Sequence, residues 1–215
     1  MANGKRAESG KRSDRDSGDT SQIIINGVLS VLAEEGIANL TTKAVSARAD
    51  VSTAAIHYFF ETKENLLYST FRYMVKALRD ETTEIRRKET DPLKRIARSI
   101  EVHFSPFHFV EDASILWPQL WAYSGSDAAA ARLFRIFSAR MIGNYTADLH
   151  EAGLDPKQAR LKAVELSALT RGLWLEKRMA ESVEQSECWR ILEYALAAVA
   201  KETGRKAPRF RRRSE

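Results

Sequence analysis

The sequence predicts an all-α protein, with three helices in a small N-terminal module and six helices in a larger C-terminal bundle. Among 215 residues there are only 10 glycines and 5 prolines, with no glycine between Gly36 and Gly125 and no proline before Pro92. Because sheet-rich folds need turn residues every ~8–12 positions, this long interval favours helices. The chain is 44% hydrophobic and 29% charged, which supplies a core and excludes an intrinsically disordered protein.

The first helix is expected to follow a polar extension. Residues 1–20 contain almost nothing to bury, so we expect them to form a disordered N-terminal extension. Helical periodicity begins near Ser21 and gives one apolar face, made of Ile24, Val28, Val31 and Leu32. Gly36 supplies the C-terminal stop of this helix.

Two short helices follow, separated by a tight turn. Thr41 or Thr42 is an N-cap for a helix that ends near Ala49. The segment 50–52 (Asp-Val-Ser) breaks the pattern, because Asp tolerates the left-handed conformation and Ser can cap the next helix, residues 53–59. Two helices joined by such a turn form a helix-turn-helix unit, whose second helix enters the major groove of DNA.

The remaining sequence is expected to form long amphipathic helices. After a boundary at residues 61–62, Lys63 opens a helix that runs to about residue 88, and the later spans are 92–105, 111–124, 127–152, 156–181 and 186–203. Asp-Pro pairs at 91–92 and 155–156 are start signals, since Asp caps the helix and proline suits its first position. Pro118 either kinks its helix or lies in the first turn.

The predicted organisation has four parts. They are a disordered extension (1–20), a helix-turn-helix domain (21–66), a C-terminal domain (67–203) and a basic disordered tail (204–215). The net charge of +5 and the isoelectric point near 9.3 come from the tail, since residues 201–215 carry seven basic and two acidic side chains. The charge therefore describes the tail, and any argument for DNA binding must come from local features.

Several function classes are disfavoured. The single cysteine, Cys188, excludes an internal disulfide and a multi-cysteine metal site, and the four histidines are too scattered to hold a metal together. We find no glycine-rich phosphate loop, no secretory signal and no apolar run of the roughly 18 residues that would span a membrane. The sequence predicts a cytoplasmic protein without a metal, a cofactor or enzymatic activity.

Side chains on and beside the short helix 53–59 suit DNA contact. Thr53, Ala54 and Ala55 lead the helix, where small side chains allow close approach and methyl groups suit thymine. Contacts to phosphates are expected from helix starts and from the flank of the helix, at Thr42, Lys43, His57, Tyr58 and Lys63. Ser52, the expected cap of this helix, completes the set of candidate DNA-binding residues. The alternative is an ordinary corner of a helical bundle, with Ile56, Phe59 and Phe60 in its core. Spacing alone leaves both readings open.

Aromatic residues recur at helical spacing in the C-terminal domain. The candidate ligand-binding residues are Phe104, Phe107, Trp117, Trp121, Phe137, Met141, Arg171 and Trp174. A cavity between helices is where bundles bind small molecules, and tryptophan faces attract an amine by about 0.5–2 kcal/mol each. Arg171 instead favours a carboxylate or another anionic group. The alternative is that these side chains form core or dimer interface.

Residues 41–67, TTKAVSARADVSTAAIHYFFETKENLL, resemble the DNA-binding segment of TetR-family repressors. That segment reads T-T-x-x-I-A-x-x-A-G-V-S, followed by a short helix, an aromatic cluster and K-E-x-L. Asp50 and Ala54 stand where the family has glycine, and His57 stands where it has tyrosine, which alters an expected phosphate contact.

Two later stretches are similar to the choline-responsive BetI-like branch of that family. They are WPQLWAYSGSDAAAARLFRIFSAR (117–140) and ELSALTRGLWLEKRM (165–179). Arg171 stands where this branch usually has Asp, and Glu176 stands where it often has Arg, so the charge beside the expected pocket is inverted.

The resemblance implies a homodimeric repressor that a small molecule releases from a palindromic operator in double-stranded DNA. It also implies that the last two helices pair across a two-fold axis, through Leu166, Leu169, Leu173, Leu192, Leu196 and Val199. Periodicity shows only that both helices are amphipathic, and packing inside the monomer stays open. A helical adaptor that keeps the fold without binding DNA is the alternative function.

Overall fold

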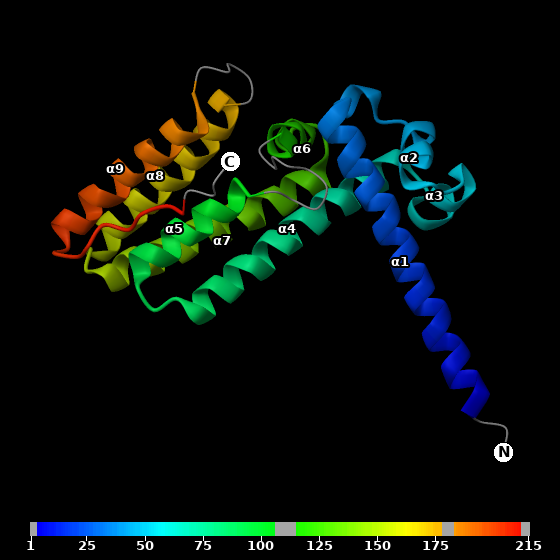
Figure 1. Ribbon diagram of the computed structural model, residues 1–215, viewed down its shortest axis with the longest axis horizontal. Coiled ribbons are helices and arrows are strands. Elements are labelled where there is room, and N and C mark those ends of the chain that lie inside the picture. Colours follow the sequence, from blue (N-terminus) through cyan, green and yellow to red (C-terminus); the bar gives the residue numbers. More distant parts are fainter. Residues whose placement is uncertain (1–3, 106–114, 178–182, 212–215) are drawn as a thin grey trace. The chain divides into compact units, whose positions relative to one another are not determined.

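The computed structural model describes residues 4–105, 115–177 and 183–211, and it is built from helices (Figure 1). No strand occurs in these ranges, and the predicted all-α class is confirmed. The chain divides into an N-terminal unit, up to Phe71, and a C-terminal unit from Arg72 onward. The elements are α1 (Gly4–Glu34), the 3-10 helix η1 (Ile37–Asn39), α2 (Thr42–Ala49), α3 (Thr53–Phe60), α4 (Lys63–Lys88), α5 (Pro92–His103), α6 (Leu116–Ser124), α7 (Ala128–Ala152), α8 (Pro156–Leu175) and α9 (Gln185–Glu202).

The N-terminal unit is built on the packing of α1 against α2. The apolar face expected for the first helix is buried, and it comprises Ile24, Val28, Val31 and Leu32. The two helices cross closely at Gly27, where an added Cβ would lie 2.9 Å from the Cβ of Ala49. A glycine is therefore required at this crossing because any side chain would push the helices apart.

Local side chains fix the ends of α2 and α3. The hydroxyl of Thr41 accepts a hydrogen bond from the backbone N–H of Ala44 at 3.1 Å, and Ser52 does the same for Ala55 at 3.1 Å. Between the helices Asp50 adopts the left-handed conformation, with φ of 51°. The predicted caps and turn are thus the ones that the structure uses.

Within the expected disordered extension, residues 4–20 are helical in the structure. Helix α1 begins at Gly4 and continues without a break to Glu34, instead of starting near Ser21. Extending a helix that is already packed needs no new nucleus, and each added residue gains a backbone hydrogen bond. Composition alone does not predict this helical extension. It shows that the segment can bury little surface, but not that the segment continues a helix that is already packed.

The C-terminal unit is a helical bundle in which α7 packs against α5, α6 and α8, and α9 lies beside α8 (Figure 1). Its central positions are large apolar side chains with almost no exposure, among them Leu93, Ile96, Ile100, Leu149 and Leu166. Asp91 and Asp155 cap α5 and α8 as predicted, and Pro118 lies in the first turn of α6. The expected start of that helix at residue 111 lies outside the described residues.

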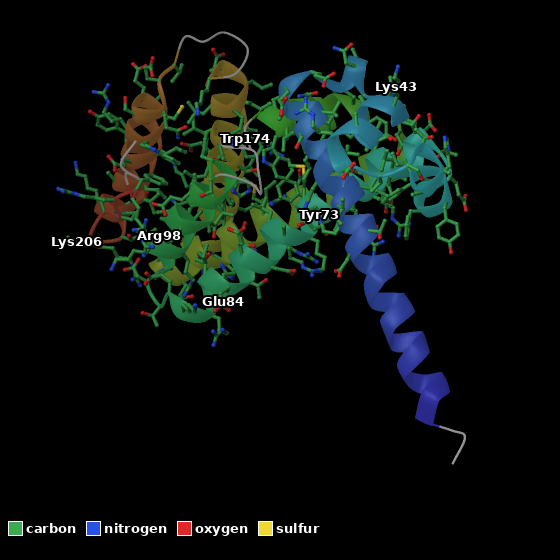
Figure 2. The ribbon with its side chains drawn as sticks, turned by 45° about the vertical axis from the view of Figure 1, so that its right-hand side comes forward. Lys43, Tyr73, Glu84, Arg98, Trp174 and Lys206 are labelled. Atoms are coloured by element: carbon green, nitrogen blue, oxygen red, sulfur yellow. The ribbon has the colours of Figure 1, made fainter. Side chains whose placement is uncertain are left out.

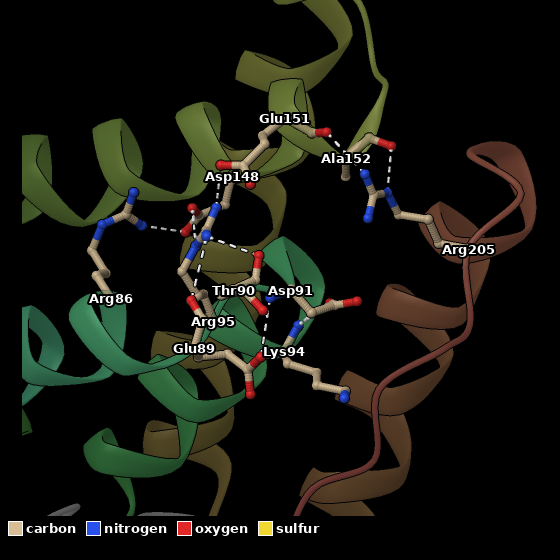
Figure 3. A network of polar contacts seen from close by, with 10 residues as sticks. All are labelled: Arg86, Glu89, Thr90, Asp91, Lys94, Arg95, Asp148, Glu151, Ala152 and Arg205. Atoms are coloured by element: carbon tan, nitrogen blue, oxygen red, sulfur yellow. Dashed lines mark hydrogen bonds and ion pairs between the residues drawn. The ribbon is translucent and has the colours of Figure 1, made fainter.

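A buried carboxylate ties three helices together near the end of α4 (Figure 3). Asp148 on α7 is 1% exposed and pairs with Arg86 of α4 and with Arg95 of α5, whose Nε lies 2.8 Å from its Oδ1. Arg95 also pairs with Glu151 and donates to the carbonyl of Thr90 at 3.2 Å. Burial raises the pKa of the Asp148 carboxyl, while both guanidinium groups oppose that rise. Removing one partner from such a buried group typically destabilises a protein by about 3–5 kcal/mol.

The tail expected to be disordered from residue 204 is packed on the C-terminal unit as far as residue 211. Phe210 is buried, and its ring stacks on Trp189 of α9 with 5.0 Å between the centroids. The guanidinium of Arg205 donates to the carbonyl of Ala152, at 2.8 Å, where α7 ends (Figure 3).

Backbone atoms of the tail are also engaged. The guanidinium of Arg98 on α5 donates to the carbonyl of Arg209 at 3.1 Å, and the N–H of Phe210 donates to Glu193 at 3.2 Å. One aromatic anchor and a few backbone contacts hold this segment, while its basic side chains remain exposed. Residues 204–211 therefore differ from the expected disordered tail, because that expectation weighed only the charges, and residues 212–215 lie outside the described residues.

Candidate nucleic-acid interface and effector cavity

Helix α3 has one buried face and one exposed face. Ile56 and Phe60 are buried in the N-terminal unit, as the alternative of a bundle corner required. The opposite face is open, and Tyr58 is 81% exposed with its ring edge-on to Phe59. The same helix therefore contributes to the core and still offers a free surface.

The predicted DNA-contacting residues gather on this open surface. Lys43, Ser52, Thr53, Ala54, His57, Tyr58 and Lys63 are exposed, while Thr42 and Ala55 are half-buried. Lys43 projects from the N-terminal unit near the start of α2 (Figure 2). The hydroxyl of Ser52 is engaged as a cap, so its part in any contact with a phosphate is to hold the first turn of α3 in place.

The basic side chains of this unit are not equivalent. Arg48 on α2 forms ion pairs with Glu34 and Glu35 at the end of α1. Its charge is thereby partly neutralised, and its side chain joins α1 to α2 while remaining partly exposed. Lys43 and Lys63 are exposed cations at the two ends of the helix-turn-helix segment.

Most of the predicted ligand-binding residues meet in one aromatic cluster of the C-terminal unit. Trp117 stacks on Phe137, with 5.5 Å between centroids and 9° between the ring planes, and on Trp174 at 5.6 Å and 13°. Phe104 packs against Trp174 at 6.2 Å. Trp174 lies inside the bundle (Figure 2). Phe107 lies outside the described residues.

These rings fill most of the space between them. The hollow next to Trp121, Arg171 and Trp174 has a volume of only about 10 Å³. Trp121 is 41% exposed and stacks on Phe134 at 6.0 Å. The tryptophan cluster is therefore largely core, which is the alternative that the sequence left open.

Arg171 lies beside this cluster as a half-buried cation. It donates 2.8 Å hydrogen bonds to the hydroxyls of Ser138 and Ser167, and its guanidinium lies 6.0 Å from the ring centre of Phe134. Burial lowers the pKa of the Arg171 guanidinium. Since its two hydroxyl partners are neutral, the group keeps its attraction for an anion.

A larger cavity, of about 40 Å³, lies among α4, α5 and α7. Of the predicted ligand residues only Phe137 and Met141 line it, together with Val75, Leu78, Arg79, Thr82, Ser99, His103, Ile136, Arg140, Asn144 and Tyr145. Sequence reasoning missed these positions because they come from three separate helices, each of which reads as ordinary amphipathic sequence. His103 and Tyr145 were the available signal, as polar side chains on otherwise apolar faces.

The leucines expected at a dimer interface belong to the core of the chain itself. Leu166, Leu173, Leu192, Leu196 and Val199 are 0–5% exposed, and Leu169 is half-buried. These side chains pack inside the monomer, as the alternative reading allowed. A different set of apolar side chains on α8 and α9 faces outward, namely Leu161 (64% exposed), Val164, Ile191 and Tyr194 (77% exposed).

The described ranges contain neither a membrane-spanning helix nor a cluster of metal ligands. None of their helices is both long and apolar enough to cross a membrane. Within the same ranges, no group of three or more His, Cys, Asp or Glu side chains is arranged to hold a metal ion.

Comparison with known families gives two matches that cover most of the chain. Residues 24–69 match the model for bacterial regulatory proteins of the tetR family. Residues 92–201 match the model for the C-terminal domain of BetI-type transcriptional repressors. The HTH-type transcriptional regulator BetI of Burkholderia ambifaria is 30% identical over 158 residues, which is 73% of this chain and 81% of that protein.

Solved structures share the fold. A transcriptional regulator from Rhodococcus sp. Rha1 has a TM-score of 0.74 at 18% identity and covers 85% of this chain and 96% of its own. A TetR transcription regulator from Haloarcula marismortui has a TM-score of 0.73 at 20% identity, with coverage of 86% and 98%. A protein from Saccharomonospora viridis, solved in complex with choline, has a TM-score of 0.73 at 19% identity, with coverage of 86% and 96%.

Proposed function

Because this chain belongs to the TetR family and carries a BetI-type C-terminal domain, we propose that it is a repressor that a small molecule releases from a palindromic operator. Membership of the family makes it a DNA-binding transcriptional regulator and not an enzyme. We propose, in addition, that it represses transcription, that its operator is palindromic and that a small-molecule ligand releases it from that operator. The observation that carries the proposal is the open face of α3, with Tyr58 fully presented beside exposed Thr53 and Ala54.

In this proposal α3 reads the major groove. The methyl groups of Thr53 and Ala54 contact thymine methyls, and Lys43, Tyr58 and Lys63 bind phosphates on either side. Few cations take part, so one copy binds weakly and its affinity depends on salt. Two copies, with recognition helices about 34–36 Å apart, bind two half-sites one helical turn apart.

The homodimer is proposed to form through the outward apolar side chains of α8 and α9. Leu161, Ile191 and Tyr194 are large and exposed, which a lone monomer has no reason to keep on adjacent helices. Leu161→Asp places a charge on this face and is expected to give a monomer in analytical ultracentrifugation. Arg160→Asp alters a neighbouring exposed position without removing apolar surface and serves as its control.

The effector is proposed to bind in the cavity among α4, α5 and α7. Helix α4 contributes residues to both units, since the boundary between them falls after Phe71. Val75, Leu78 and Thr82 present one side of that helix to the cavity. A ligand that shifts α4 therefore acts on a helix that is shared with the N-terminal unit. The coupling free energy between ligand binding and DNA binding is about 1–3 kcal/mol in typical cases.

Fluorescence anisotropy with DNA from upstream of its own gene tests the proposed operator binding. We expect salt-sensitive binding of the dimer to a palindrome in that DNA, and much weaker binding to a scrambled duplex. Lys63→Ala should weaken the binding and lower its salt dependence, because one phosphate contact is lost. Lys94→Ala removes an exposed lysine of the C-terminal unit and is the matched control. Equal binding to palindrome and scrambled DNA would refute the operator.

A further inference from the structure

Two side chains that line the cavity among α4, α5 and α7 each carry a buried polar atom that has no hydrogen-bond partner among the described residues. These atoms are Nε2 of His103 and the hydroxyl of Tyr145, and both side chains are 2% exposed. Leaving such a group unpaired costs about 1–3 kcal/mol, so native proteins seldom do it without a functional reason. Both side chains line the same cavity, which suggests that a ligand is their common partner.

The hydrogen-bonding character of each atom follows from its surroundings. Nδ1 of His103 lies 2.7 Å from the carbonyl oxygen of Ser99, which can only accept, so Nδ1 carries the proton. Burial lowers the pKa of His103 to about 4, so the ring is neutral near pH 7 and Nε2 is an acceptor. Burial raises the pKa of the Tyr145 phenol, which therefore keeps its proton and can donate. The two atoms are therefore complementary to a ligand hydroxyl, which can donate to Nε2 of His103 and accept from the phenol of Tyr145.

The charged side chains that line the cavity are both cationic. Arg79 and Arg140 are exposed and form its solvent-facing edge, and among the described residues no Asp or Glu lines the cavity. Arg79 has an ion pair with Asp80 at 2.7 Å, which leaves Arg140 as the better partner for a ligand. A carboxylate can take a bidentate pair from a guanidinium, whereas an ammonium group at this edge is repelled.

The rest of the lining is apolar. Phe137, Met141 and Ile136 of α7 face Val75 and Leu78 of α4 across the cavity. These side chains favour a hydrocarbon or aromatic body between the two polar ends of the ligand.

We propose that the effector is a small amphipathic hydroxycarboxylate, with its hydroxyl between His103 and Tyr145 and its carboxylate on Arg140. This assignment rests on the proposed function, since it names the ligand class for the same cavity. It departs from a choline-like ligand at one point. The hydroxyl of choline suits His103 and Tyr145, but its ammonium group would lie beside the two guanidinium groups of Arg79 and Arg140, where Asp80 already pairs with Arg79.

Calorimetry on the full-length protein without DNA tests the ligand class. The hydroxycarboxylate probes are 4-hydroxyphenylacetate and 6-hydroxyhexanoate, and the comparison compounds are phenylacetate, tyramine and choline. We expect at least one hydroxycarboxylate to bind. Phenylacetate, which lacks the hydroxyl, and tyramine, which replaces the carboxylate with an ammonium, should each bind at least about tenfold more weakly than 4-hydroxyphenylacetate. Tighter binding of tyramine or choline, or no binding of either hydroxycarboxylate, overturns the proposal.

Two variants locate the binding. Arg140→Gln should weaken hydroxycarboxylate binding about tenfold, whereas Arg135→Gln, at an exposed position of α7 that does not line the cavity, should leave it unchanged. Tyr145→Phe removes one oxygen atom and should weaken binding of 4-hydroxyphenylacetate while phenylacetate binding is unaltered. Equal effects of the two arginine variants, or equal effects of Tyr145→Phe on both acids, contradict the assignment.

Release of operator DNA is measured separately, by anisotropy with the same compounds. If a hydroxycarboxylate binds and the DNA complex persists, the ligand class is supported and the proposed release is refuted. If choline or tyramine dissociates the complex and the acids do not, release is supported and the ligand class is refuted.

Discussion

Protonation of His103 should couple the stability of the C-terminal unit to pH. In the folded chain burial lowers the pKa of this imidazole to about 4, whereas an unfolded chain has the ordinary value of 6.5. Below pH 6.5 the imidazole of His103 becomes protonated in the unfolded state, whereas in the folded state it stays neutral down to about pH 4. The group thus contributes stability that is fully present above pH 6.5 and is lost as the pH falls through this window.

The magnitude follows from the two pKa values. Between pH 7 and pH 5 the unfolded histidine becomes almost fully protonated while the folded one stays neutral, so the free energy of unfolding should fall by about 2 kcal/mol. Carboxylates titrate mainly below this range, which keeps the window informative.

Urea unfolding followed by tryptophan fluorescence is the assay. All four tryptophans lie beyond residue 72, so the signal reports the C-terminal unit. His103→Phe should remove the loss between pH 7 and pH 5, while His150→Gln, which replaces an exposed histidine, should retain it. Neighbouring charges such as Arg171 are present in the parent chain and in both variants, so their effect on the free energy of unfolding cancels in the comparison. If His103→Phe loses as much stability as the parent chain, the buried neutral imidazole is not the cause.

Three other substitutions test the fold. Gly27→Ala should destabilise the N-terminal unit by about 1–3 kcal/mol, because its Cβ would lie 2.9 Å from Ala49, and circular dichroism during urea unfolding measures the loss. Asp50→Gly should be neutral or stabilising by up to about 1 kcal/mol, since glycine adopts a φ of 51° without strain, and a lower melting temperature would contradict this. Phe210→Ala should expose Trp189 and shift its fluorescence to longer wavelength, whereas an unchanged spectrum would mean that the tail does not cover this ring.

Sequence predicted best where structure is decided locally. The hydroxyls of Thr41 and Ser52 and the carboxylates of Asp91 and Asp155 cap helices within three residues of themselves. A local pattern of this kind can be read directly from the chain. The helix-turn-helix boundaries followed for the same reason.

Which apolar face points inward could not be read in the same way. Leu192 and Leu196 of α9 are spaced like an interface seam, but they are buried where α9 packs against α5 and α8, while Tyr194 faces outward. Periodicity shows which apolar residues share one face of a helix, but it does not show which other element packs against that face. The cavity was missed for a related reason, because His103 and Tyr145 come together only when α5 packs on α7.

The ion pair between Arg86 and Asp148 fixes the C-terminal end of α4 to α7, while the N-terminal end of α4 belongs to the other unit. At 1.5 Å per residue, Lys63 lies about 35 Å along the helix from Arg86, whereas Arg79, at the cavity, lies about 10 Å from it. If the ion pair acts as the fulcrum, a displacement of about 1 Å at the cavity becomes about 3 Å at the end that carries the helix-turn-helix segment. In the proposed function, a displacement of this size would be comparable to the spacing of base pairs, about 3.4 Å.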